Sequence, residues 1–298
     1  MTDITGWMRT FVNVADALSF SRAAARLDMP QSTVSRQVGA LERYLGAALL
    51  KRTTRSIALT SEGLAFYEAA LRALAAIDEA EASVGLHGAL SGQVRLTAPL
   101  TLAGARLIAM LARFQEAQPR IEIDLRLSDH ALNLVSDNLD FAIRVGAIGD
   151  SRVIARRIGT ARRVMVAAPA YLARRGVPHV PDDLAAHNCI SYSLLASGSK
   201  WTLGAHPPID ISSNFRADSP DALRAAALAG IGIAVNARWL FEEDLAHGNL
   251  VELLPGHPPQ DMPIHLVMPA GRYVAARVRV LADHLIAAFA ADPLLRAV

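Results

Sequence analysis

The sequence predicts a two-domain α/β protein that opens with a helix-turn-helix, and three observations lead there. A 52% hydrophobic content over 298 residues can bury more core than one domain usually needs. Apolar residues recur at helical spacing through the first ninety residues, and strand-like runs alternate with helical ones from residue 93 onward. Only 5% of residues are aromatic and 19% are charged, which favours helices joined to a mixed sheet over an all-β design.

Composition also narrows the function classes. The single cysteine, Cys189, excludes an internal disulfide, and no zinc-ligand spacing surrounds it. The first residues show no basic-then-apolar signal segment, and the longest hydrophobic run, residues 225–235, is too short to span a bilayer. We therefore expect a cytoplasmic protein without a membrane partner.

The first three helices are predicted from periodicity and punctuation. Residues 11–18 form one helix, and a second runs over residues 22–27 with Ser21 as its N-cap. After a polar break at residues 28–31, a third helix ends near Leu45, with Gly46 suited to a left-handed C-terminal position. At about 100° per residue, the third helix turns an apolar face to one side and a polar face to the other. The apolar face holds Val34, Val38, Leu41 and Leu45, and the polar face holds Ser32, Arg36, Gly39 and Arg43.

Positive charge gathers in this region. Residues 22–55 contain seven basic and two acidic side chains, although the whole chain has a net charge of only +2. A local basic patch indicates a polyanion site. Residues 49–60 follow with strand-like apolar residues around a basic centre, and we interpret them as a β-wing with its tip at residues 52–56. A helix-turn-helix with these features presents its second helix to the major groove of DNA.

Four sequence elements occur in order within residues 11–63: F-x-x-V-A-x-x-x-S-F-x-x-A-A-x-x-L, S-x-x-V-S-R-Q-V-x-x-L-E, L-G-x-x-L-L-x-R and L-T-x-x-G. In this ordered set the chain resembles the winged helix-turn-helix of the LysR-type transcriptional regulators. The resemblance implies a recognition helix whose beginning approaches bases and phosphates, and a wing that holds the flanking backbone. The implied contact residues are Gln31, Ser32, Ser35 and Arg36 in the helix and Arg52, Thr54 and Arg55 in the wing.

Two positions depart from the family pattern. Many relatives carry Ser or Thr where Pro30 stands, and this difference bears on how the recognition helix is capped. Relatives often carry a basic residue where Gly39 stands, so glycine at this position would remove one phosphate contact. Ser35 also has a plain structural interpretation, because a serine near a helix start can simply cap it.

The chain from residue 61 to about residue 86 is one long helical pattern. Its apolar stripe, spaced as in a coiled coil, is formed by Leu64, Tyr67, Leu71 and Leu74. In the resembled family this helix pairs antiparallel with its copy, so we expect a homodimer or homotetramer. The alternative is that the stripe packs back on its own domain. We place the DNA-binding domain at residues 1–60, the linker helix and hinge at 61–90, and the effector-binding domain at 91–298.

Strands and helices alternate after residue 93, which predicts parallel βαβ units with a short helix around Asn133. Stretches such as RRVMVAAPAYLARRG and DALRAAALAGIGIAV resemble the family's effector-binding domain. The resemblance implies a fold like that of the periplasmic solute-binding proteins, with two lobes and two crossovers. We place lobe I at residues 93–160 and 269–298 and lobe II at 161–268.

Ligands in open α/β sheets bind at the carboxyl ends of the strands. Strand ends predict Pro99, Leu100, Thr101, Arg144, Val145 and Asp218 as effector contacts, and the resemblance adds Tyr192, Ser197 and Trp201. Thr101 and Ser219 begin helices, where exposed N–H groups favour an anion, and Arg144 would add a charge, so a small anionic effector is our hypothesis. Packing roles for Tyr192 and Trp201, and a simple capping role for Thr101, remain alternatives.

No catalytic, metal or cofactor motif is present: the sequence contains no HExxH cluster, G-x-S-x-G elbow or Walker A loop. Cys189 has His187 two residues away, but a buried small hydrophobe is the preferred interpretation of this thiol. An enzyme and a transport-type solute-binding subunit are the alternatives. The basic first ninety residues favour a regulator that binds promoter DNA and a small effector, with RNA polymerase open as a further partner.

Overall fold

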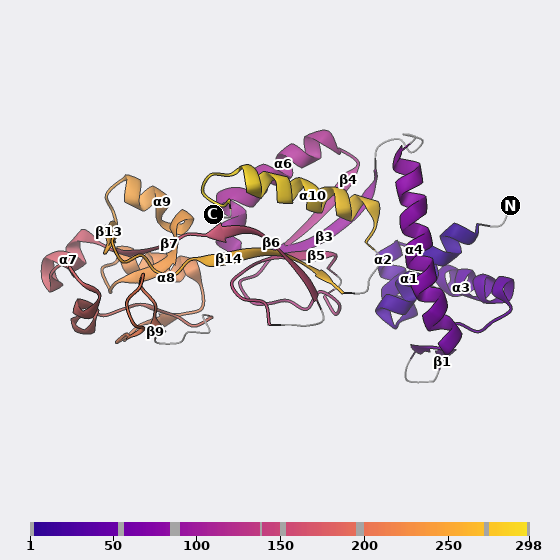
Figure 1. The fold of residues 1–298 in the computed structure, drawn as a ribbon, viewed down its shortest axis with the longest axis horizontal. Coiled ribbons are helices and arrows are strands. Elements are labelled where there is room, and N and C mark those ends of the chain that lie inside the picture. The colour runs from indigo at the N-terminus through magenta and orange to yellow at the C-terminus, as the bar shows by residue number, and fades with distance from the viewer. Residues whose placement is uncertain are drawn as a thin grey trace.

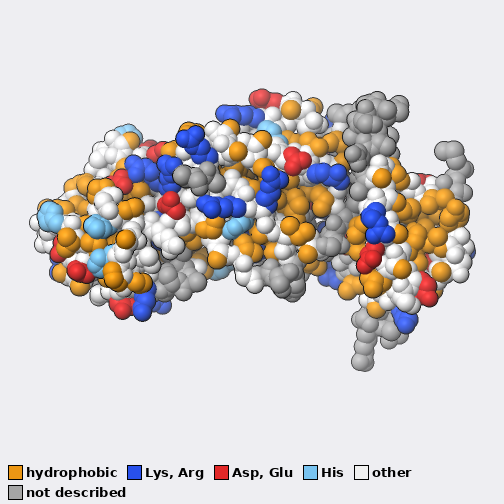
Figure 2. Space-filling view, in the orientation of Figure 1, with side chains coloured by type: hydrophobic (Ala, Val, Ile, Leu, Met, Phe, Trp, Pro, Cys, Tyr) orange, Lys and Arg blue, Asp and Glu red, His pale blue; other side chains and the backbone are white. Residues whose placement is uncertain are grey.

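The computed structural model of the 298-residue chain describes residues 3–52, 57–83, 90–137, 139–149, 153–194, 200–270 and 274–296. Three bodies follow one another along the long axis: an N-terminal helical domain at one end, lobe I in the middle and lobe II at the other end (Figure 1). Charged side chains are spread over both lobes on the face shown in Figure 2.

The N-terminal domain is a three-helix unit with a two-stranded wing and a long fourth helix. Its elements are α1 (Ile4–Ala17), α2 (Phe20–Leu27), α3 (Gln31–Leu45), β1 (Leu50–Arg52), β2 (Ile57–Leu59) and α4 (Ser61–Ser83). β1 and β2 pair antiparallel, as expected for a wing. Val34, Val38 and Leu41 of α3 are fully buried in the domain core, which confirms the predicted apolar face. Leu45 differs, because it is 36% exposed at the end of the helix.

The helix ends depart from the sequence-based expectations at two places. α1 begins at Ile4, well before residue 11. α2 is capped by Ser19, whose hydroxyl accepts the N–H of Arg22, so the expectation that Ser21 is the cap was wrong. Ser21 already lies inside the helix. Gly46 takes the predicted left-handed conformation after α3, with φ 66°.

Two polar contacts and one glycine fix the wing between α3 and α4. The Glu42 carboxylate accepts the N–H groups of Leu49 and Leu50 at 2.9 and 3.1 Å. Thr60 starts α4, because its hydroxyl accepts the N–H of Gly63 at 2.8 Å. A Cβ at Gly63 would lie 2.0 Å from the Leu49 carbonyl oxygen, so only glycine lets α4 approach the wing this closely. The L-T-x-x-G element is therefore a packing requirement.

The predicted dimerisation stripe on α4 is divided between two environments. Leu74 is fully buried in the core of its own domain, and Tyr67 and Leu71 pack against that core. The Tyr67 hydroxyl donates to the carboxylate of Asp16 in α1. The expectation that the stripe lies outside the domain core was wrong for these three residues, because α4 packs along α1. Leu64 alone points outward, with 54% exposure.

Lobe I is a five-stranded sheet with helices against it, in the strand order β4-β3-β5-β14-β6. β3 is parallel to β4 and β5, as predicted, and β14 is antiparallel to β5 and β6. One helical stretch contains a five-residue π-helical segment, η1. The elements are β3 (Gly92–Ala98), α5 (Leu100–Leu102), η1 (Ala103–Leu107), α6 (Ile108–Ala117), β4 (Ile121–Leu127), β5 (Phe141–Val145), β6 (Val153–Ala161), β14 (Met262–Pro269) and α10 (Ala276–Ala291).

Lobe II is built on the antiparallel sheet β12-β7-β13. Along β7, Val164 and Val166 enter one hydrophobic cluster while Met165 and Ala167 enter another, because successive side chains of a strand point to opposite faces. The elements are β7 (Arg163–Ala167), α7 (Pro169–Arg175), the 3-10 helix η2 (Pro181–Ala186), β8 (Ser191–Tyr192), β9 (Lys200–Trp201), β10 (Ile209–Asp210), β11 (Arg216–Ala217), α8 (Pro220–Leu228), β12 (Ala234–Ala237), α9 (Arg238–Ala246) and β13 (Val251–Leu253).

Three expectations about the two lobes need correction. Among the described residues of lobe II, parallel pairing is confined to β8 with β11 and a bridge between Cys189 and Ile233, so the main sheet of the lobe is not a set of parallel βαβ units. The segment at Asn133 is a turn and not a helix. The chain returns to lobe I at Met262, at the start of β14, and not at residue 269. The reason is that β14 pairs with β5 and β6 of lobe I up to Pro269. No helix in the described chain has the length and hydropathy to cross a membrane.

The position of Leu74 makes a prediction about stability. Leu74→Ala should lower the free energy of unfolding of the N-terminal domain by about 2–5 kcal/mol, because truncation of a buried leucine leaves a cavity. Hydrogen exchange of α1 and α4 peptides, followed by mass spectrometry, measures this loss. Leu64→Ala on the exposed side of the same helix is the control and should leave exchange in α1 unchanged. Equal effects of the two variants would contradict the packing described here.

Candidate functional site

The recognition helix α3 exposes the face that the sequence predicted. Gln31, Ser32 and Arg36 are exposed, whereas Ser35 is half-buried. Pro30 stands at the N-cap, and no side chain of the described residues caps the helix there, so the departure from Ser or Thr leaves the first turn of α3 open. An open helix start presents N–H groups and a positive dipole end, which suit a phosphate.

The wing is described only at its base. The backbone of Arg52 belongs to β1 and pairs with Ile57. Thr54 and Arg55, the other predicted wing contacts, lie outside the described residues, and so does the side chain of Arg52. Arg22 has a structural role, because its guanidinium donates to the carbonyl of Ala17 at the end of α1.

The carboxyl ends of β3, β4 and β5 meet at one edge of the lobe I sheet, as parallel strands require. A cavity of about 130 Å³ lies there between the two lobes. Four predicted effector residues line this interlobe cleft: Pro99, Thr101, Val145 and Tyr192. Sequence reasoning missed further lining residues, among them Asp129, Arg163, Leu194, Asn236, Trp239 and Met262.

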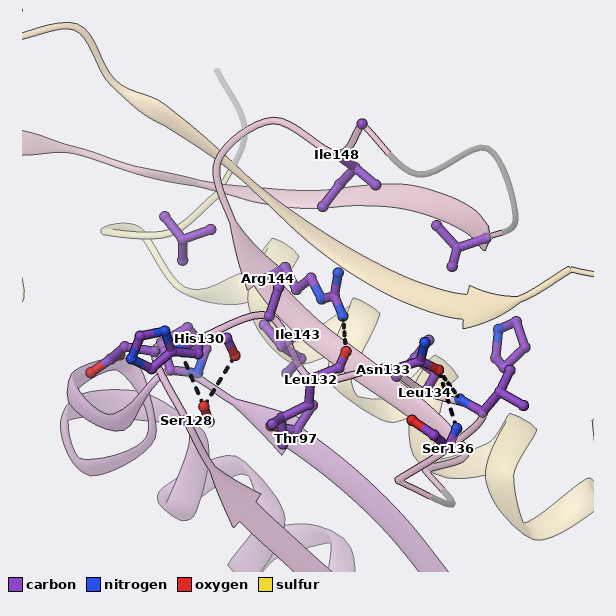
Figure 3. Close-up of a pocket in the computed structure, with 18 of the residues that line it drawn as sticks. Thr97, Ser128, His130, Leu132, Asn133, Leu134, Ser136, Ile143, Arg144 and Ile148 are labelled. Atoms are coloured by element: carbon purple, nitrogen blue, oxygen red, sulfur yellow. Dashed lines mark hydrogen bonds between the residues drawn. The ribbon is translucent and has the colours of Figure 1, made fainter. Parts of the chain in front are cut away.

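The interlobe cleft adjoins a larger cavity of about 780 Å³ on lobe I, which shares Pro99, Asp129, Val145 and Leu194 with it. Residues 128–136 form much of the wall of this lobe I cavity (Figure 3). The predicted residue Arg144 lines it and donates a hydrogen bond to the carbonyl oxygen of Leu132. Arg144 thus holds the wall loop in place while its guanidinium borders the cavity.

A carboxylate of the protein itself already lies at the start of α5. The Asp129 carboxylate accepts the N–H of Leu100 at 3.2 Å, so it occupies the helix start at which we expected a ligand anion. Burial raises the pKa of Asp129, and the nearby charge of Asp221 raises it further. Burial, together with the charges of Asp129 and Asp218, also raises the pKa of Tyr192 to about 12. The hypothesis that this helix start receives an anionic effector is therefore not supported by the geometry.

The two lobes touch across the cleft through Trp239 of α9. Its indole N–H donates to the Thr101 hydroxyl at 3.4 Å, so the side chain of Thr101 takes part in a contact between the lobes. Asn236 lies near the end of β12, Trp239 follows that strand, and Asp129 follows β4, so the strand-end rule could have found all three. Arg163 begins a strand, and no sequence signal marks it.

Three predicted effector residues lie elsewhere. Trp201 is 7% exposed and packs in the core of lobe II, so the packing interpretation was the correct one. Asp218 is exposed and lines none of these cavities, and Leu100 contributes its backbone N–H alone. Ser197 lies outside the described residues.

Cys189 behaves as the buried hydrophobe that the sequence suggested. Its thiol is fully buried, and burial raises the pKa of that thiol to about 12. The ring nitrogen Nδ1 of His187 lies 3.2 Å from the Tyr171 hydroxyl, so this nitrogen has a hydrogen-bond partner other than the thiol. A thiol that stays protonated near neutral pH is a weak nucleophile.

Comparison with known proteins matches both parts of the chain. Residues 5–64 match the family model described as bacterial regulatory helix-turn-helix protein, lysR family, and residues 87–290 match the LysR substrate binding domain. The chain is 34% identical over 291 residues to the uncharacterized HTH-type transcriptional regulator YhjC of Escherichia coli, covering 93% of this chain and 95% of that protein. It is also 34% identical to the HTH-type transcriptional regulator CrgA of Neisseria meningitidis, over 94% and 95% of the two chains.

Two solved structures share the architecture. CrgA of Neisseria meningitidis, a LysR-type transcriptional regulator, matches with a TM-score of 0.61 at 33% identity, covering 95% of this chain and 97% of that chain. Full-length AphB, a virulence activator of Vibrio cholerae, matches with a TM-score of 0.58 at 27% identity, covering 95% and 98%.

The raised pKa of Asp129 predicts a pH-dependent effect on stability. A carboxyl whose pKa is raised on folding destabilises the folded state once pH rises through that pKa. Asp129→Asn keeps an acceptor for the Leu100 N–H and removes the charge, so it should raise the Tm at about pH 7 and lose this gain near pH 3.5. Asp210→Asn, an exposed carboxylate, is the control for thermal unfolding at both pH values. A gain that persists at the lower pH would contradict this account.

Proposed function

This chain belongs to the LysR family of transcriptional regulators, and we propose that it binds promoter DNA as an oligomer and responds to a small molecule in the interlobe cleft. It has the helix-turn-helix and the effector-binding domain of that family. The observation that supports DNA reading most directly is the exposed beginning of α3, opposite the buried face of the same helix. A DNA-binding role places the protein in the cytoplasm, and RNA polymerase is a further partner in this proposal.

The recognition surface consists of the exposed Gln31, Ser32 and Arg36, with half-buried Ser35 beside them. Arg36 is suited to a bidentate contact with guanine or with a phosphate, because its planar guanidinium presents two parallel donors. The open start of α3 adds main-chain N–H groups to the phosphate contacts. Arg52, Thr54 and Arg55 would extend these contacts along the flanking backbone.

Dimerisation would use a different face of α4 from the one that the stripe suggested. The exposed residues of this helix are mostly small and recur at helical spacing, which lets a second helix approach closely. Between residues 64 and 76, the exposed ones that the structure describes are Leu64, Ala65, Glu68, Ala69, Arg72, Ala73 and Ala76. We place the contact with a second copy on this exposed α4 face, because the buried Leu74 side has no room for a partner.

The effector would occupy the interlobe cleft and extend into the adjoining lobe I cavity. The shared wall residues join the two spaces, and the combined site has both apolar and polar walls, with polar side chains frequent on the lobe I side. Because Asp129 fills the helix start, we place any carboxylate of the effector beside Arg144 instead. The Tyr192 hydroxyl and the amide nitrogen of Asn236, whose amide oxygen accepts the N–H of Ala237, would then orient the rest of the molecule.

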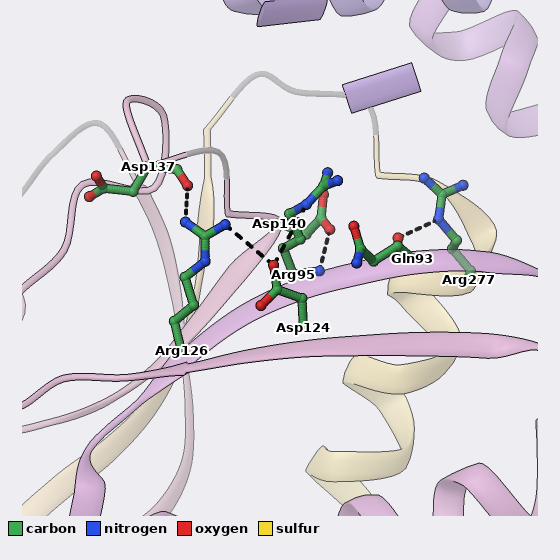
Figure 4. Close-up of polar contacts among 7 residues, drawn as sticks. All are labelled: Gln93, Arg95, Asp124, Arg126, Asp137, Asp140 and Arg277. Atoms are coloured by element: carbon green, nitrogen blue, oxygen red, sulfur yellow. Dashed lines mark hydrogen bonds and ion pairs between the residues drawn. The ribbon is translucent and has the colours of Figure 1, made fainter. Parts of the chain in front are cut away.

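One strand connects the effector site to the linker. The carboxyl end of β3 reaches the cleft at Pro99, and its amino end at Gly92 follows the linker segment. Figure 4 shows how firmly β3 is held: Arg95 lies 3.9 Å from Asp124, and the Arg277 side chain donates to the main-chain carbonyl of Gln93 at 2.9 Å. A change in lobe position would therefore reach the linker through a stiff strand, and a ligand biases that position by its differential affinity.

The DNA-reading role predicts that Arg36→Ala weakens operator binding by about tenfold or more, because each specific arginine contact contributes about 1–3 kcal/mol. Fluorescence anisotropy with a promoter fragment from beside the gene measures the affinity. Arg43→Ala, at the far end of the same helix and also exposed, is the matched control and should have a smaller effect. Size-exclusion chromatography should show the same oligomer for both variants. An unchanged affinity of Arg36→Ala would sink the assignment.

The dimer proposal predicts that Ala69→Glu converts the oligomer to a smaller species, because it places a charge where a second helix would pack. Light scattering coupled to size-exclusion chromatography measures the mass. Ala173→Glu on the exposed side of α7 is the control. An unchanged mass for Ala69→Glu would place the subunit contact on another surface.

A further inference from the structure

A second cavity lies on the other side of the crossover strands from the interlobe cleft. It has a volume of about 610 Å³ and is lined by residues of both lobes and both crossovers. Ala161 and Met262 face the cleft, whereas Arg162 and Asp261 face this second cavity, as alternating side chains of extended strands require. Arg163 borders both spaces. We call this second space the crossover cavity.

Four arginines line the crossover cavity. Arg106 comes from η1 of lobe I, Arg162 and Arg163 from the crossover, and Arg238 from α9 of lobe II. Figure 2 shows basic side chains beside acidic ones at the junction between the lobes. Because one cation comes from each lobe and two from the strand between them, a single bound molecule could contact both lobes.

The three carboxylates of the cavity already have partners. Glu242 accepts from Arg106 at 2.8 Å, which makes an ion pair between the lobes. Glu252 accepts from Arg238 at 2.8 Å. Asp261 accepts the main-chain N–H of Arg163 at 3.1 Å. All three carboxylates of the cavity therefore already accept hydrogen bonds from the protein. Some guanidinium N–H groups of the four arginines have no carboxylate partner among them.

The remaining donors belong to three arginines. Arg162 is exposed, and in the described parts of the chain no carboxylate pairs with its guanidinium. Within the described residues, the Arg163 guanidinium donates one hydrogen bond, to the main-chain carbonyl of Gln260 at 3.3 Å, and burial lowers the pKa of this guanidinium. Among the described residues the buried Nε of Arg106 has no hydrogen-bond partner, and it lies 3.9 Å from the Asp292 carboxylate. Guanidinium groups with unused donors are the groups that recognise carboxylates and phosphates.

We propose that the crossover cavity is a second ligand site, separate from the effector cleft, and that it takes a small multivalent oxyanion such as a dicarboxylate or a phosphate. Arg162 and Arg163 hold the anion, and Arg238 and Arg106 border it from the two lobes. The site touches both lobes and both crossover strands, so an anion there favours the lobe arrangement in which these four arginines converge. Promoter binding would then depend on two small molecules.

Two anions serve as probes: inorganic phosphate and succinate. Titration calorimetry of the full-length protein at low ionic strength should show saturable binding of at least one of them, and the two arms separate a phosphate site from a dicarboxylate site. Arg162→Gln should weaken that binding about tenfold or more, because it removes a charge-assisted contact. Since Arg162 is exposed and its guanidinium has no carboxylate partner, the variant should fold normally.

Two controls make the outcome decisive. Arg175→Gln removes the same charge from an exposed position in α7 outside the cavity and should leave the affinity unchanged. Arg144→Ala alters the effector site and should also leave it unchanged. Loss of binding in Arg144→Ala but not in Arg162→Gln would put the anion in the effector site and overturn the proposal. Equal losses in Arg162→Gln and Arg175→Gln, or no saturable binding of either anion, would overturn it as well.

Discussion

The antiparallel ladder between β6 and β14 is the constraint on which the two-lobed half of the molecule depends. Its register runs from Met262 opposite Ala161 to Pro269 opposite Val153, so both chain passages between the lobes leave one sheet side by side. Two adjacent strands can bend or twist together but cannot slide apart without losing their shared hydrogen bonds. The interlobe cleft and the crossover cavity lie on opposite sides of this ladder, and movement that opens one must change the other.

The first domain shows how far sequence patterns reach. The faces of α3, the wing and the C-terminal Gly46 all follow from local rules, because side-chain spacing and turn chemistry act within a few residues. These local rules do not predict what the Leu74 side chain packs against. Its spacing fits an intermolecular seam and an intramolecular core equally well, and only the tertiary approach of α4 to α1 decides between them.

The strand-end rule located residues on the lobe I side of the interlobe cleft, but it located none in the crossover cavity. The prediction that Pro99 and Val145 lie at the cleft was correct, because the parallel part of the lobe I sheet fixes where the strand ends lie. In lobe II the rule covers only part of the cleft, since the sheet is antiparallel and Arg163 lines the cleft from the start of a strand. The crossover cavity had no sequence signal, because its arginines come from three distant parts of the chain and meet only through folding.

The close contact at Gly63 has a mechanical consequence. With its Cα lying against the Leu49 carbonyl, and with Thr60 bonded across the same joint, α4 cannot tilt relative to the wing without a steric clash. The helix and the wing must therefore rotate as one rigid body. In the proposed dimer, a small reorientation of paired α4 helices would swing both wings through larger arcs, so the angle between the subunits would set the spacing of the phosphates that the wings could contact.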